Sequence, residues 1–208
     1  MAEPRFTLSR AEFLLPFAEP DRTRRIRDGY VLAKGDKIAD VGPWTDSVAA
    51  RMEALGSDLR VLGAKAGGEL FPRQKGVLLP GFVKAHGHDH EQPLIGVAKD
   101  VPLTVWLDRA VNPFTRFMNQ NAAELTELLG CSPNLATYRM ARVCDIHYGI
   151  TACMVHHCNF NKYHLEEIVT ANEAAGTTMI VAIGGQDRFY FAELLDTPED
   201  ALGRLNKA

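Results

Sequence analysis

Histidines concentrate in one short segment of the sequence, His86-Gly87-His88-Asp89-His90. His86 and His88 are two positions apart and follow a strand-like run, Phe82-Val83-Lys84-Ala85. Because side chains alternate faces along a strand, the two imidazoles should project to the same side. Two neutral imidazoles placed in this way can bind one divalent cation, zinc in the first place, with iron as the alternative. Such a cation would lower the pKa of a water molecule and so permit hydrolysis near neutral pH.

The spacing of two histidines is a weak signal by itself, and surface or hydrogen-bonded pairs show it too. His90 shares their parity if the strand continues, so it is a candidate substrate contact, although its acidic neighbours suit an exposed loop. His156 and His157 close a later strand-like run. One of the two should face the same site and contact the substrate, and a buried, hydrogen-bonded histidine is the alternative.

The first eighty residues favour short strands with turns. Two runs, 29–33 and 37–41, are joined by a turn whose Gly35 suits a tight hairpin. A helix should follow Pro43, and further strands are expected at 59–62 and 76–79.

From Pro80 onwards, strand-like and helix-like segments alternate, which predicts parallel strands with crossover helices. The clearest helix should begin after Ser132-Pro133 and end near Gly149. Its apolar face comprises Ala136, Met140, Val143 and Cys144. The remaining elements expected in this half are helices at 103–111, 122–129 and 165–175, strands at 151–155 and 178–183, and the start of a helix after Pro198.

Four segments in order resemble the amidohydrolase superfamily. The run Leu78 to His88, with Pro80-Gly81-Phe82 before the paired histidines, resembles the start of that family's barrel. The segments that follow resemble its cytosine deaminase and chlorohydrolase branch. They are 94–96, 102–107 and the Gly149-Ile150-Thr151 entry to a second barrel strand, and 28–42 is similar to the family's small sheet domain.

This resemblance implies an α/β fold, the first part of a (β/α)8 TIM-type barrel preceded by half of a small β-sandwich domain. The division would fall between 1–79 and 80–208. It also implies a metal-dependent hydrolase that uses metal-activated water on C–N or C–Cl bonds of a small molecule, most simply to deaminate a nitrogen heterocycle.

A complete barrel of this kind needs about 250 residues, so residues 80–208 offer three strands and the start of a fourth. The family's other metal ligands and its catalytic acid are expected outside this chain, and the chain alone is expected to be inactive. A fragment, a subunit of a split enzyme completed by a second chain, an inactive truncation and a homo-oligomer remain open. A non-catalytic subunit that keeps the fold for assembly is the alternative function.

Lys84 departs from the family pattern, in which the position two before the first histidine is often Asp or Asn. By strand parity Lys84 should share the face of His86, where its charge would repel a metal. Either a carboxylate neutralises it or the site differs from the family's usual one.

The composition excludes other classes. A net charge of −3 gives no basic surface for nucleic acid. No apolar run approaches the ~20 residues that a membrane helix needs, and no signal peptide is visible. The four cysteines form no CxxC pair, which suits reduced thiols in a cytoplasmic protein. A doubly wound binding protein would need a glycine-rich phosphate loop, and the sequence has none.

Overall fold

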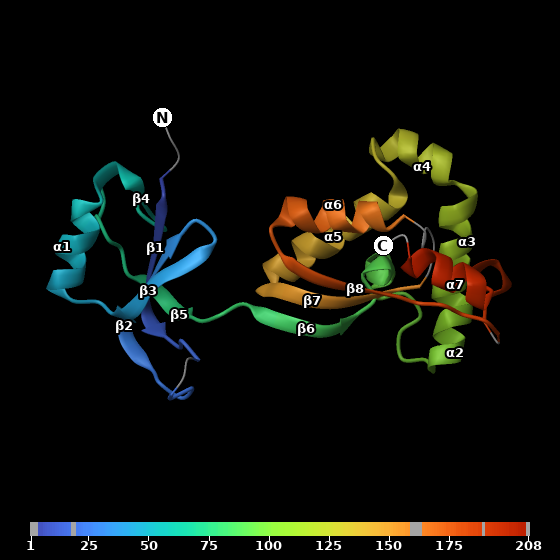
Figure 1. Ribbon diagram of the computed structural model, residues 1–208, viewed down its shortest axis with the longest axis horizontal. Helices are drawn as coiled ribbons and strands as arrows, with labels where there is room; N and C mark the ends of the chain where they lie inside the picture. The colour runs from blue at the N-terminus through green and yellow to red at the C-terminus, as the bar shows by residue number, and fades with distance from the viewer. Residues whose placement is uncertain (1–3, 18–19, 159–163, 189, 207–208) are drawn as a thin grey trace. The chain divides into compact units, whose positions relative to one another are not determined.

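The computed structural model describes residues 4–17, 20–158, 164–188 and 190–206 (Figure 1). It divides into two compact units, Met1–Pro80 and Gly81–Ala208. Within the described ranges, no helix combines the length and the apolar character needed to cross a bilayer.

The first unit is a five-stranded sheet with one helix packed on it. The strands run in the order β3-β2-β1-β4, and β5 also pairs with β1. β1 is antiparallel to β2 and parallel to β4 and β5. The bounds are β1 Phe6–Leu14, β2 Ile26–Lys34, β3 Lys37–Pro43, α1 Asp46–Ala54, η1 Gly56–Asp58, β4 Leu59–Val61 and β5 Gln74–Leu78.

The predicted hairpin is confirmed. β2 and β3 pair with Lys34 opposite Lys37, and Gly35 between them has φ +58°, a backbone conformation that suits glycine. The helix after Pro43 begins at Asp46, because Thr45 accepts a hydrogen bond from the Val48 amide and caps it.

The core of the first unit lies between the sheet and α1. Leu8, Tyr30, Leu32 and Met52 form a buried cluster there, and Leu8 is fully buried. Met52 is the residue through which α1 joins this cluster, so the helix packs on the sheet by its one buried side chain.

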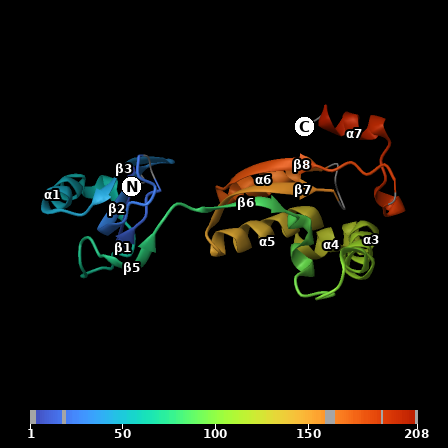
Figure 2. The same ribbon diagram turned by 90° about the horizontal axis from the view of Figure 1, so that it is seen from below.

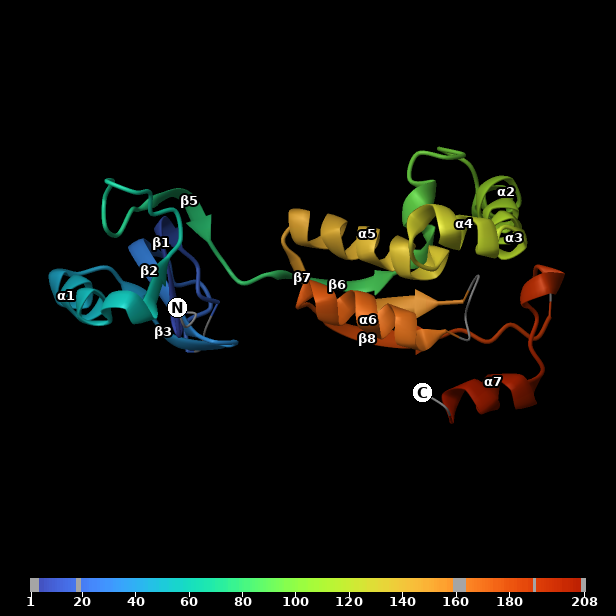
Figure 3. The same cartoon turned by 90° about the horizontal axis from the view of Figure 1, so that it is seen from above.

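The second unit contains a parallel sheet of three strands in the order β6-β7-β8, as the alternation of strands and helices predicted. Figure 2 shows the strands side by side, and α5 and α6 lie together over one face (Figures 1 and 3). The strands are β6 Phe82–Gly87, β7 Ile150–His157 and β8 Thr178–Ile183. The helical segments are η2 Asp89–Leu94, α2 Leu103–Trp106, η3 Leu107–Val111, α3 Asn112–Gln120, α4 Ala122–Leu129, α5 Pro133–His147, α6 Leu165–Ala175, η4 Ala192–Leu194 and α7 Pro198–Leu205.

Helix α5 buries a different face from the predicted one. Met140 and Val143 are 41% and 67% exposed, whereas Tyr138 and Arg142 are buried against the sheet and its following loop. Hydropathy misplaces this face because its polar members are buried in mutual pairs rather than left in water.

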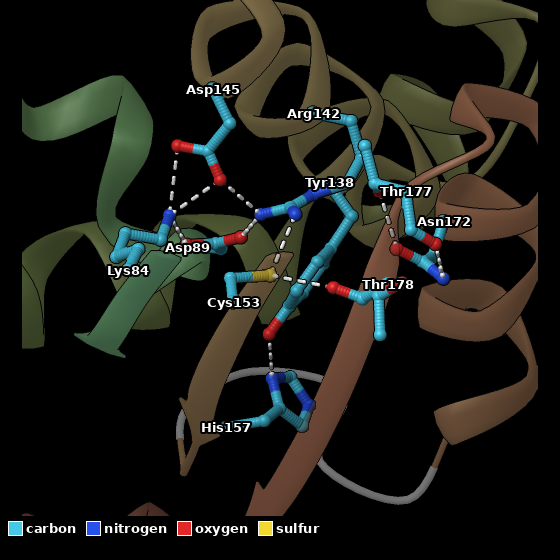
Figure 4. A network of polar contacts seen from close by, with 10 residues as sticks. All are labelled: Lys84, Asp89, Tyr138, Arg142, Asp145, Cys153, His157, Asn172, Thr177 and Thr178. Atoms are coloured by element: carbon cyan, nitrogen blue, oxygen red, sulfur yellow. Dashed lines mark hydrogen bonds and ion pairs between the residues drawn. The ribbon is translucent and has the colours of Figure 1, made fainter. Parts of the chain in front are cut away.

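The polar side of α5 forms an ion network with β6 and η2 (Figure 4). Lys84 Nζ lies 2.7 Å from an Asp89 oxygen and 2.7 Å from an Asp145 oxygen. Arg142 pairs with the same two carboxylates, and its Nη1 lies 2.8 Å from the sulfur of Cys153 on β7. Burial opposes the charge on Lys84, but the hydrogen bonds to Asp145 and Asp89 outweigh it and raise its pKa.

We predict that Leu8→Ala destabilises the first unit by about 2–5 kcal/mol, because it removes a fully buried side chain from a packed core. Ile38→Ala is the matched control, since Ile38 is 72% exposed on the neighbouring hairpin. Urea unfolding followed by Trp44 fluorescence in a Trp106→Phe background measures the difference. Equal losses in the two variants would contradict the assignment of the core.

We predict that Arg142→Met destabilises the second unit by about 3–5 kcal/mol, because it leaves two buried carboxylates with one cation. Arg139→Met is the control, since Arg139 is exposed on the same helix. Urea unfolding followed by Trp106 fluorescence in a Trp44→Phe background reports on this unit. A loss below about 1 kcal/mol for Arg142→Met would show that the network is not structural.

Candidate metal and substrate site

Five histidines gather where β6 and β7 end. His86 lies in β6, His88 follows that strand and His90 lies in η2, while His156 and His157 are the last two residues of β7. The ring centroids of His86 and His156 are 4.2 Å apart, and those of His88 and His90 are 5.7 Å apart. Segments more than sixty positions apart in the sequence therefore meet through imidazole rings.

The Nε2 atoms of His86 and His88 are 3.0 Å apart. Two imidazole nitrogens that share a tetrahedral zinc ion lie about 3.3 Å apart, given zinc–nitrogen distances of about 2.0–2.1 Å. The observed separation is close to this value, and the other ring nitrogen of His88 is buried with no hydrogen-bond partner among the described residues. The pair therefore fits a divalent cation of this size.

A pocket of about 570 Å³ opens beside the pair and is lined by His86, His88, Glu91 and Trp106 among others. Its volume lies in the range of small-molecule sites. Burial raises the pKa of Glu91 to about 7, against a smaller opposing effect from His88. A carboxyl group with such a pKa can both accept and donate a proton near neutral pH.

Sequence reasoning missed Glu91, because an acidic residue after a histidine cluster is also what an exposed loop contains. Its chemical interest comes from burial, which the local sequence does not reveal. The same loop was expected to expose His90, and that expectation is wrong, since His90 is fully buried.

His90 and His157 lie in the interior rather than on the pocket. Burial lowers the pKa of His90 to about 3, so its ring is neutral at physiological pH. Its Nε2 is 3.4 Å from a Glu91 oxygen, without hydrogen-bond geometry. His157 is fully buried, and its Nδ1 is 2.8 Å from the hydroxyl of Tyr138 (Figure 4). Of the two histidines that end β7, His156 is the one packed against both His86 and His88.

Lys84 does not share the face of His86, contrary to the prediction from strand parity. The pairing of β6 with β7 is irregular between Lys84 and Gly87, so alternation is broken before the histidines. Lys84 lies opposite Cys153 and reaches Asp145 on α5, whereas His86 packs on His156. Of the two explanations open at the sequence level, neutralisation by carboxylates is confirmed.

No family model matches the sequence. The chain is 30% identical over 138 residues to a 5-methylthioadenosine/S-adenosylhomocysteine deaminase of Nitratidesulfovibrio vulgaris, a match over 66% of this chain and 27% of that protein. It is 29% identical over 188 residues to a probable guanine deaminase of Deinococcus radiodurans, over 89% of this chain and 38% of the relative.

Solved structures give a consistent picture of the fold. Guanine deaminase from Bradyrhizobium japonicum superposes with a TM-score of 0.68 at 19% identity, over 97% of this chain and 40% of that one. Atrazine chlorohydrolase from Arthrobacter aurescens TC1, solved in complex with zinc, gives 0.62 at 16% identity, over 97% and 43%.

This chain therefore spans less than half the length of the proteins it resembles. The architecture is mixed α/β, and its structural neighbours are TIM-barrel proteins. The resemblance seen in the sequence is confirmed: the chain is a relative of the deaminases of the amidohydrolase superfamily and corresponds to a part of their length.

Proposed function

We propose that His86 and His88 bind one divalent cation, zinc in the first place and iron as the alternative, in a hydrolase that deaminates a nitrogen heterocycle. The observation that supports this most directly is the 3.0 Å separation of the two Nε2 atoms beside the 570 Å³ pocket. When bound, such a cation supplies Lewis acidity and lowers the pKa of water. C–Cl hydrolysis would use the same groups.

The chain's own residues have separable parts in this proposal. The two imidazoles hold the cation, and the Glu91 carboxyl exchanges a proton at the wall of the pocket, with its pKa of about 7. His156 packs on both histidines and is the candidate substrate contact. Because His90 and His157 are fully buried, the proposal gives them no direct contact with a substrate.

The finer fold assignment belongs to the same proposal. Three parallel strands with two helices on one face are what the first part of a (β/α)8 barrel would present. Residues 1–79 would then be half of a small β-sandwich domain, and 80–208 the first units of the barrel. Apolar side chains exposed on these strands, such as Val83 at 71% and Ile180 at 63%, support a partner segment or chain that covers them.

We predict that His86→Ala lowers the zinc bound per chain by one equivalent, because one imidazole cannot replace a chelating pair. His147→Ala is the control, since His147 is exposed at the end of α5. Equilibrium dialysis of the 208-residue chain, with zinc counted by mass spectrometry, measures the loss. Equal zinc in the unmodified chain and in His86→Ala would refute the metal assignment.

We predict that the purified chain, loaded with zinc, releases no ammonia from guanine or 5′-methylthioadenosine. Two histidines alone cannot complete a catalytic cation site, which takes three protein ligands and an open position. An enzyme-coupled ammonia assay, with a His86→Ala sample as the background, checks this. Zinc-dependent turnover above that background would contradict the expectation that ligands outside this chain are required.

A further inference from the structure

A second group of possible metal ligands lies next to the His86–His88 pair. His88, His90 and Cys158 each offer one ligand atom, and these atoms all lie within 4.8 Å of one another. His88 and His90 come from the loop after β6, and Cys158 directly follows β7. Carboxyl ends of neighbouring parallel strands thus supply two nitrogens and one sulfur to the same point.

His90 provides the independent sign of a ligand. It is fully buried, and neither of its ring nitrogens makes a hydrogen bond within the part of the chain that the structure describes. A buried polar group without a hydrogen bond costs about 1–3 kcal/mol, so folding tolerates His90 at a loss that a bound cation would recover. His88 has a second nitrogen in the same condition, which lets it take part here as well as with His86.

Cys158 is held in place from β8. The side-chain amide of Gln186 donates to the Cys158 carbonyl at 3.3 Å. Gly184 is the residue that admits this approach, because a Cβ atom there would lie 2.5 Å from the Cβ of Cys158. The Gly184-Gly185-Gln186 segment at the end of the third strand thereby has a structural role in presenting the cysteine.

A second group with similar residue types shows what a closed site looks like. Asp89, Asp145 and Cys153 also lie within 4.8 Å of one another. Their charges are taken up by Lys84 and Arg142, which bond all three side chains between them. That group has its cations from the protein itself, so it is a salt-bridge network and not a metal site.

We propose that His88, His90 and Cys158 form a second cation position that binds a thiophilic divalent ion, with zinc or cobalt as the probe. Thiolate and imidazole together select zinc-like ions over calcium or magnesium. Zinc needs ligand atoms about 3.3–3.7 Å apart, given bond lengths of about 2.0–2.3 Å. Binding would therefore draw the three side chains together by about one ångström. The Cys158 thiol gives up its proton to solvent as the metal–sulfur bond forms.

The test is the sulfur-to-metal charge-transfer absorption of the full 208-residue chain titrated with Co²⁺ under anaerobic conditions. We expect the unmodified chain and Cys131→Ser to show this near-ultraviolet band. Cys158→Ser and Cys158→Ala should lose it, and His86→Ala should keep it, because His86 lies outside the group. Circular dichroism of each variant shows that it is folded before titration.

The outcomes separate this inference from the metal pair. Cobalt that binds without a thiolate band would overturn the Cys158 site and leave the His86–His88 proposal standing. A band that persists in both Cys158 variants would assign the sulfur to another cysteine and overturn the inference equally. A band lost only in the Cys158 variants, together with one proton released per thiolate formed, would establish the site.

Discussion

The ion network formed by Lys84, Asp89, Arg142 and Asp145 fixes the segment on which the candidate site depends. Asp89 lies between His88 and His90, and its carboxylate is held by Lys84 from β6 and by Arg142 from α5. Asp89 and Arg142 are 2% and 1% exposed, so their pairing is hardly screened by water. With Asp89 anchored, the residues on either side of it have little freedom to rotate away from the end of the sheet.

The same network explains how a lysine can precede a metal-binding pair. An irregular pairing after Lys84 breaks the alternation of β6, so that Lys84 faces α5 while His86 packs on His156. Asp145 then serves as a second carboxylate for a cation that burial would otherwise make costly. The charge that seemed to oppose a metal at the sequence level instead stabilises the loop that carries the ligands.

The sequence predicted the parts of this arrangement that local patterns determine. The β2–β3 hairpin, β8 and α6 follow from turn residues, apolar runs and a terminal glycine. β1 was not identified, because its buried residues Leu8, Ala11 and Leu14 recur every third position rather than every second. Strand alternation could not reveal it, although it is the strand with the most neighbours in its sheet.

Features that depend on long-range pairing could not be predicted from local pattern. The face of α5 was misassigned because Arg142 and Asp145 look like solvent-facing residues until Asp89 and Lys84 are brought to them. The burial of His90 and Glu91 has the same origin, since a loop rich in acidic residues and histidine reads as exposed. The proximity of His86 and His88, by contrast, depends on two adjacent residues of one segment, so spacing alone was enough to indicate it.

Charge balance connects the network to the chemistry of the histidines beside it. An unpaired Asp89 carboxylate would favour protonation of His90, and a protonated imidazole cannot bind a metal. Lys84 and Arg142 neutralise that carboxylate, and burial together with His88 keeps the pKa of His90 near 3. Two cations matched to two carboxylates therefore leave the neighbouring imidazole neutral, with its lone pair free. A loop that carried the same histidines without this pairing would lose both its position and the protonation state that ligand binding requires.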